Sequence, residues 1–233
     1  MHDILHGCLD AFHLLLTGEG QVWEILARSL VVSGLSVLLG CAIGMPIGIL
    51  VGLHRFPGRR LVASLLNAGV GLPPVVVGLF VYLLLSRSGP LGFMRLLFTP
   101  SAMIIAQTIL AAPVIGALTF SAIAGTDPAV RLTARSLGAT AQQATLTQLA
   151  EARFAMGAAV IAGFGAVISE VGAVMIVGGN IAGYTRVMTT AIVLETGKGD
   201  FSLAIALGIV LLFTSLIVNL GLSYLQMGPG RRR

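Results

Sequence analysis

The sequence predicts an all-α membrane protein with about five transmembrane helices, each long enough to cross a bilayer. Of its 233 residues, 56% are hydrophobic and only 10% are charged. Soluble domains carry about 25% charged residues, so this chain lacks the polar groups that would cover a water-exposed surface. Its mean hydropathy is +0.98, and the apolar residues gather in long runs. We treat residues 1–233 as a single transmembrane domain.

Each predicted span is an apolar run of about 20 residues, the length that crosses the hydrocarbon core. The N-terminal segment, residues 1–24, differs because its apolar residues follow helical spacing with polar residues opposite. It is too short and too polar on one face to span, which predicts a helix on the outer membrane surface. The predicted spans are residues 29–53, 61–85, 101–123, 154–177 and 201–225.

Basic residues near the ends of the spans predict the orientation. Segment 1–24 has no Lys or Arg and four acids, whereas the first connection carries Arg55, Arg59 and Arg60. With five spans, nine basic residues fall on the side of that connection and five on the other side. The sequence therefore predicts a multi-pass protein of the cell (plasma or inner) membrane, with the N-terminus outside and the C-terminus in the cytoplasm.

The connection at residues 125–153 has the pattern of two short cytoplasmic helices. Asp127 and Pro128 supply an N-cap and a first helical residue, and Gly138 is a natural C-terminal stop. Thr140 and Gln143 then form a capping-box pattern that starts a second helix. Such a helical hairpin is either a docking element for another protein or a plain surface connection.

This connection resembles the cytoplasmic coupling loop of ABC importer permeases. The family's loop reads Glu-Ala-Ala, a short spacer, Gly, and later Leu-Pro, and the run from Leu132 to Thr140 keeps the spacing and the glycine. Leu132 and Thr133 stand at the Glu and the first Ala, and Ala150 stands at the Pro. The resemblance implies that an ATPase contacts these residues of the loop: Arg135, Gly138, Thr140, Gln143, Leu149 and Arg153.

Two further blocks resemble the oxyanion permeases of the tungstate and molybdate group, most closely the tungstate permeases. One block is Leu72 to Leu79, and the other extends from Ile168 through Arg186 to Ile192. The similarity covers roughly residues 25–226. It implies the transmembrane domain of a type I ABC importer that translocates tungstate, with molybdate or sulfate as the alternative substrate.

The resemblance also implies partners. The chain would assemble with a second copy of itself, two ABC ATPase subunits and an extracytoplasmic oxyanion-binding protein, within a lipid bilayer and without nucleic acid. ATP and Mg²⁺ would be bound by the ATPase, so we expect no cofactor in this chain.

The second span is interrupted by Pro73 and Pro74, which remove backbone donors and disfavour a helix just before them. The pair predicts either a simple kink in a packed helix or a break that lines the translocation path, since broken backbone in a membrane must face protein or water. The resemblance implies a pathway or gate formed by Pro73, Pro74, Gly78, Glu170, Asn180, Thr185, Arg186, Thr189 and Thr190.

Glu170 is the one acid that we expect well inside an apolar span, where a charge costs at least about 2.5–3.5 kcal/mol. It has either a structural role or a gating role. In the structural role it pairs with Arg186 or Arg87, or is held by backbone and hydroxyl groups. A proton-coupled secondary transporter that uses Glu170 is a further hypothesis, which predicts an acid network and inverted repeats. The outer connection, residues 178–200, either dips into the outer mouth or forms a plain turn.

The sequence predicts neither a catalytic residue nor a metal site. A phosphate-binding loop is missing, because Gly197, Lys198 and Gly199 form a turn-like tripeptide without the rest of that motif. The two cysteines have no obvious partners and the four histidines lie in surface segments. We therefore expect a non-catalytic membrane subunit, with ATP hydrolysed by a separate protein. A membrane scaffold or enzyme would have no reason to carry the cytoplasmic hairpin.

Overall fold

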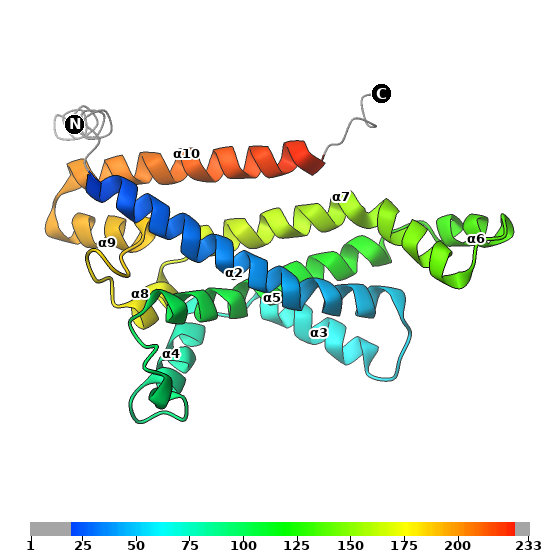
Figure 1. Ribbon diagram of the computed structural model, residues 1–233, viewed down its shortest axis with the longest axis horizontal. Coiled ribbons are helices and arrows are strands. Elements are labelled where there is room, and N and C mark those ends of the chain that lie inside the picture. Colours follow the sequence, from blue (N-terminus) through cyan, green and yellow to red (C-terminus); the bar gives the residue numbers. More distant parts are fainter. Residues whose placement is uncertain (1–19, 227–233) are drawn as a thin grey trace.

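The computed structural model describes residues 20–226, in which all regular structure is helical. The predicted surface helix falls mostly outside the described residues, and from Gly20 onward the chain already belongs to the first long helix. Figure 1 shows the arrangement of the helices. The elements are α2 (Gly20–Leu53), α3 (Arg59–Val70), α4 (Pro74–Leu85), η1 (Gly92–Met94), α5 (Pro100–Ala124), α6 (Pro128–Ser136), α7 (Ala141–Ile168), α8 (Gly172–Gly178), α9 (Met188–Lys198) and α10 (Phe201–Gln226).

Four helices, α2, α5, α7 and α10, are long and apolar enough to cross a membrane, and the pair α3 and α4 makes a fifth crossing if it is counted as one span. This agrees with the predicted number of about five. The predicted spans 29–53, 101–123 and 201–225 are confirmed by α2, α5 and α10, although α2 begins nine residues earlier than predicted, at Gly20 rather than Ser29.

The second predicted span, residues 61–85, is interrupted at its proline pair, as the sequence indicates. It divides into α3 and α4, which meet at an angle of 100°. Pro73 has an extended backbone (φ −65°, ψ 117°) and Pro74 is the first residue of α4. The proline pair therefore produces a full break and not a simple kink, because the chain leaves the helix before Pro73 and starts a new one at Pro74.

The fourth predicted span, residues 154–177, is wrong in its bounds. The helix α7 begins at Ala141, directly after the hairpin corner, and ends at Ile168. A short helix, α8, follows after a break at residues 169–171. The hairpin therefore has one short helix, α6, and its second helix is the first part of a 28-residue helix rather than a short one.

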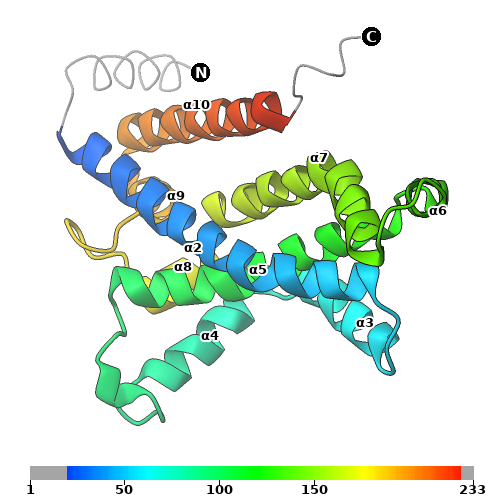
Figure 2. The same cartoon turned by 45° about the vertical axis from the view of Figure 1, so that its right-hand side comes forward.

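The helices α2 and α5 lie side by side in both views (Figures 1 and 2). Four glycines spaced four residues apart on α2 face α5, namely Gly40, Gly44, Gly48 and Gly52. A Cβ atom at Gly44 would lie 2.3 Å from the carbonyl oxygen of Ala112. Small residues at this spacing let two helix backbones approach closely, which strengthens van der Waals packing where lipid gives no hydrophobic driving force.

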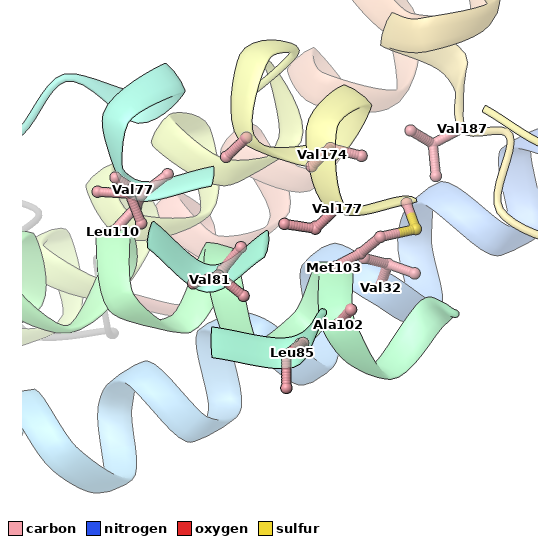
Figure 3. Close-up of a cluster of buried hydrophobic side chains, with 12 residues drawn as sticks. Val32, Val77, Val81, Leu85, Ala102, Met103, Leu110, Val174, Val177 and Val187 are labelled. Atoms are coloured by element: carbon pink, nitrogen blue, oxygen red, sulfur yellow. The ribbon is translucent and has the colours of Figure 1, made fainter. Parts of the chain in front are cut away.

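A cluster of buried aliphatic side chains joins the broken segments to the long helices (Figure 3). Val77 and Val81 of α4 and Val174 and Val177 of α8 pack around Met103 of α5. A second cluster joins α9 and α10 to the start of α2. The two ends of the molecule carry different elements. Along the long axis, α6 lies at one end and α9 at the other (Figure 1).

Candidate functional sites: the helical hairpin and the broken helices

The hairpin between α5 and α7 is built by the predicted capping residues. The Asp127 carboxylate accepts a 2.8 Å hydrogen bond from the backbone N–H of Ala129, and Pro128 is the first residue of α6. Gly138 has φ +90°, the left-handed conformation that favours glycine at a helix end. The backbone N–H of Thr140 donates to Gln143 Oε1 (2.8 Å), and the N–H of Gln143 donates to the Thr140 hydroxyl (3.3 Å). The predicted capping box is confirmed.

A groove of about 890 Å³ lies on one side of this hairpin, between α6 and the first turns of α7. Gly138 and Gln143 are the two predicted coupling residues that line it. Leu137 lines the groove and is 83% exposed, and Leu146, which precedes the lining residue Thr147, is 58% exposed. An apolar groove with exposed leucines at its rim has the shape and chemistry of a docking surface for another protein.

The remaining predicted coupling residues do not line this groove. Arg135 lies on another side of α6, in a separate pocket, and Leu149 is half-buried. Thr140 serves the capping box, and the Arg153 guanidinium lies 4.5 Å from the centre of the Phe154 ring. The structure therefore brings two of the six predicted residues together at the groove.

The two broken segments meet in space. A Cβ atom at Gly78 of α4 would lie 2.7 Å from the Cα atom of Ala173 in α8. A Cβ atom at Gly172 would lie 2.6 Å from the Val75 side chain, at the start of α4. The breaks at Pro73 and at residues 169–171 thus start two short helices that cross in close contact. The second break, at residues 169–171, was not predicted from the sequence.

Glu170 lies at the break between α7 and α8, so the expectation that it sits well inside an apolar span is wrong. Its Oε1 atom accepts a 2.9 Å hydrogen bond from the backbone N–H of Ala173, and its backbone carbonyl accepts one from the Thr189 hydroxyl (2.9 Å). Among the described residues it forms no ion pair, and the predicted partner Arg186 pairs with Glu195 instead. Of the structural alternatives, backbone capture of the carboxylate is confirmed.

Arg87, the other predicted partner of Glu170, is exposed and lines a pocket after α4 together with Arg95, Ser86 and Ser88. It makes no ion pair with Glu170 within the described residues. A proton-transfer network of acids around Glu170 is likewise not seen in the part of the chain that the structure describes.

The connection at residues 178–200 is a loop followed by α9, and so is more than a plain turn. The Thr185 hydroxyl accepts from the N–H of Ile181 (2.9 Å) and donates to the carbonyl of Gly178 (2.6 Å). Thr190 accepts from the N–H of Val187 (3.1 Å), and Asn180 donates to the carbonyl of Thr190 (3.3 Å). Thr185 and Thr190 are buried and Asn180 is half-buried. The hydrogen bonds of these three side chains to backbone groups stabilise the conformation of the loop.

Arg186 is the charged centre of this loop. Its Nη1 atom lies 3.9 Å from Glu195 Oε1, and the two side chains are 13% and 6% exposed. Lys198 Nζ lies 3.0 Å from the same carboxylate oxygen. The Arg186 Nε atom is buried and has no hydrogen-bond partner among the described residues. Arg28 of α2 fixes the loop from the other side by donating to the carbonyls of Gly183 (2.8 Å) and Arg186 (3.3 Å).

Sequence reasoning missed one buried polar connection. The Ser36 hydroxyl donates to Gln107 Oε1 (3.1 Å), and Gln107 Nε2 donates to the Val167 carbonyl (2.9 Å). This bridge joins α2, α5 and the end of α7. The sequence could have indicated this connection, because Gln107 is a polar residue within the predicted span 101–123 and must find hydrogen-bond partners in the protein. A search of the described residues finds no group of three His, Cys, Asp or Glu side chains that could hold a metal ion.

Comparison with known proteins identifies the family. No protein-family profile matches the chain. A probable anion ABC transporter permease protein of Haloferax volcanii is 46% identical over 89% of this chain and 92% of its own. The tungstate uptake system permease protein TupB of Peptoclostridium acidaminophilum is 41% identical over 97% of this chain and 99% of its own. The protein of the same name from Campylobacter jejuni is 38% identical over 93% of this chain and 90% of its own.

Solved structures agree on the fold. A chain of a bacterial ABC transporter involved in the import of alginate superposes with a TM-score of 0.74 at 21% identity, over 95% of this chain and 84% of that chain. A chain of the MetNI methionine ABC transporter superposes with a TM-score of 0.73 at 18% identity, over 92% of this chain and all of that chain. The predicted fold, the transmembrane domain of a type I ABC importer, is confirmed. The chain belongs to the family of anion permeases of ABC transporters that includes the tungstate uptake permeases.

Proposed function

We propose that this permease translocates tungstate across the cell membrane as the channel-forming subunit of an ATP-driven importer. The observation that carries the proposal is the similarity to tungstate uptake permeases from two organisms, which extends over nearly the whole of each chain. It includes the segments that form both helix breaks and the hairpin. The chain is then a non-catalytic subunit, and ATP with Mg²⁺ binds to a separate ATPase.

A homodimer with two ATPase subunits and an extracytoplasmic oxyanion-binding protein is part of this proposal. Two features support it. Large apolar side chains on α4 and α10 are exposed in the single chain, including Phe80 (63%), Leu212 (72%) and Ile217 (66%), and such surfaces need either lipid or another helix. Within residues 20–226, one chain also has at most five spans, too few to surround a hydrated pathway by itself.

In the proposed orientation the hairpin faces the cytoplasm and α9 faces outward. The distribution of Arg and Lys supports it, because Arg55, Arg59, Arg131 and Arg135 all lie at the hairpin end. The hairpin groove then receives the ATPase. A movement of the ATPase is transmitted through α7, which is continuous from the hairpin corner to the break at Glu170. The crossing of α4 and α8 at Gly78 and Ala173 is the gate in this proposal.

The test is transport by the reconstituted system. The permease, its ATPase and the binding protein encoded beside it are placed in liposomes, and ATP-dependent uptake of tungstate is measured against molybdate, sulfate and phosphate in competition. We expect tungstate uptake that requires ATP, with molybdate as the strongest competitor because both anions are tetrahedral and doubly charged. Sulfate or phosphate outcompeting tungstate would overturn the proposed substrate. Uptake without ATP, driven by a proton gradient, would overturn the ATP-driven mechanism.

A further inference from the structure

A basic pocket lies at the hairpin end of the molecule, separate from the docking groove. It has a volume of about 490 Å³ and is lined by four arginines, Arg55, Arg59, Arg131 and Arg135. Among residues 20–226, no Asp or Glu lines it. The nearest acid along the chain, Asp127, is committed to capping α6 through the N–H of Ala129. In the described part of the chain, the pocket therefore concentrates positive charge without a carboxylate in its lining to balance it.

The four arginines come from two separate parts of the chain. Arg55 follows α2 and Arg59 begins α3, whereas Arg131 and Arg135 lie one turn apart on α6. Like charges one turn apart destabilise a helix by a few tenths of a kcal/mol, and α6 has only nine residues. The turn after α2 and the helix α6 lie at the same end of the molecule (Figure 2).

Two of these guanidinium groups have no partner among the described residues. Arg59 is occupied, since its Nε atom donates to the carbonyl of Val51 (2.7 Å) and its guanidinium lies over the Phe120 ring. Arg135 donates to the carbonyl of Ala139 (3.2 Å). Arg55 and Arg131 are exposed, and within residues 20–226 the structure gives neither one a hydrogen bond or an ion pair. They are free to bind an anion with several oxygen atoms.

Apolar side chains also line the pocket, together with the polar residues Thr126 and Gln148. Leu53 is the last residue of α2, Ile123 is in the last turn of α5, and Leu132 of α6 is 67% exposed. A pocket at the ends of spans, with basic groups beside apolar ones, fits an amphipathic anion better than a free inorganic ion. Basic pockets between helices on the cytoplasmic side of a membrane have the chemistry that binds lipid headgroups.

We propose that this pocket binds the phosphate group of an anionic phospholipid of the cytoplasmic leaflet, with Arg55 and Arg131 as its principal ligands. The proposal relies on the inward orientation of the hairpin given under the proposed function. The occupied Arg59 holds one wall of the pocket in place. A bound lipid would then link the ends of α2 and α5 to α6, the helix that also borders the docking groove.

The experiment measures lipid binding by native mass spectrometry on the purified full-length chain, alone and with its ATPase. The probes are phosphatidylglycerol and phosphatidylcholine, which share the phosphate but differ in net charge. We expect tighter binding of phosphatidylglycerol. We also expect the double variant Arg55→Gln/Arg131→Gln to weaken it about 30-fold, since each Arg near an anionic surface contributes about fivefold. The matched control is Arg87→Gln/Arg95→Gln, which removes two exposed arginines elsewhere and should leave the binding unchanged.

Equal phosphatidylglycerol binding by the pocket variant and the unaltered chain would overturn the proposal. Displacement of the lipid by millimolar inorganic phosphate or tungstate would overturn the lipid as the source of the anion. Binding to the isolated chain that disappears in the assembled complex would show that the ATPase occupies the pocket, which also overturns the proposal. None of these measurements needs transport, so a wrong substrate for the importer leaves the result on the lipid intact.

Discussion

The side-chain amide of Gln107 donates a 2.9 Å hydrogen bond to the backbone carbonyl of Val167, in the last turn of α7. Carbonyls at a helix end have no partner within the helix, and in a membrane they must find one in the protein. Gln107 is buried and also accepts from the Ser36 hydroxyl. One side chain of α5 therefore holds the end of α7 and the middle of α2.

The first prediction removes this connection. Gln107→Met keeps the length of the side chain but loses both hydrogen bonds, so we expect the free energy of unfolding to fall by about 1–2 kcal/mol. Unfolding of the detergent-solubilised protein by a denaturant measures the change. Gln142→Met, at an exposed position of α7, is the control and should be neutral. A Gln107→Met variant as stable as the unaltered chain would show that the bridge contributes nothing.

Two glycines of α2, Gly44 and Gly34, should respond to alanine substitution with stability changes of opposite sign. A Cβ atom at Gly44 would lie 2.3 Å from the Ala112 carbonyl oxygen, whereas Gly34 on the same helix has no atom within 4 Å of that position. Gly34→Ala should stabilise the fold by up to about 1 kcal/mol, because Ala is the better helix former. Gly44→Ala should destabilise it, because backbone atoms of α5 must move. The same unfolding assay measures both, and equal effects would contradict the close packing.

A substitution at Gly138, the corner of the hairpin, should separate assembly of the dimer from coupling to the ATPase. Gly138 has φ +90° and no neighbouring atom within 4 Å of a Cβ position, so Gly138→Leu is strained by backbone conformation rather than by a clash. We expect the chain to insert and dimerise normally while stimulated ATPase activity and ATP-dependent uptake are lost, because α6 is reoriented. Gly138→Asn tolerates the left-handed conformation and should retain part of both activities. If Gly138→Leu keeps both, the coupling role of this corner is wrong.

Substitutions at Glu170 can test separately whether its negative charge or its hydrogen-bond acceptor is needed. Its Oε1 atom accepts from the N–H of Ala173, and a glutamine can accept the same bond. We therefore expect Glu170→Gln to behave like the unaltered chain, and Glu170→Ala to lose about 1 kcal/mol of stability together with yield of the dimer. The measurements are unfolding and the pH dependence of uptake. A Glu170→Gln variant that assembles normally but loses the pH dependence of transport would support proton coupling instead.

The sequence predicted the spans well where apolar residues continue without interruption, because the thickness of the bilayer then determines the length of the helix. The helix α5 is one residue longer than predicted at each end, and α10 is one residue longer than predicted at its C-terminal end. The hairpin caps were also predictable, because Asp127, Thr140 and Gln143 bond to backbone groups two or three residues away. Such contacts depend on local sequence and not on the tertiary fold.

The second break was not predictable in the same way. Residues 154–177 form one apolar run apart from Ser169 and Glu170, so hydropathy alone continues the helix. The break depends on contacts with distant segments, such as Val75 beside Gly172 and the Thr189 hydroxyl on the Glu170 carbonyl. The partner of Arg186 was missed for a related reason: Glu195 lies nine residues away and reaches Arg186 only because α9 folds back beside the loop.

The last prediction concerns Arg186, which is either a ligand for the passing anion or a part of the fold. Its side chain is 13% exposed and lies beside Glu195, and Arg28 donates a hydrogen bond to the backbone carbonyl of Arg186. Glu195 is 6% exposed, and without Arg186 it would keep only Lys198 as a charged partner.

These contacts favour the structural role, so Arg186→Gln should lower the free energy of unfolding by about 1–2 kcal/mol, because a buried carboxylate loses one of two partners. The KM for the transported anion should not change. Arg87→Gln, at an exposed position, is the matched control and should alter neither quantity. A manyfold rise in KM for Arg186→Gln with unchanged stability would instead make Arg186 a direct ligand of the anion. The buried Nε atom without a partner would then be the donor that meets it.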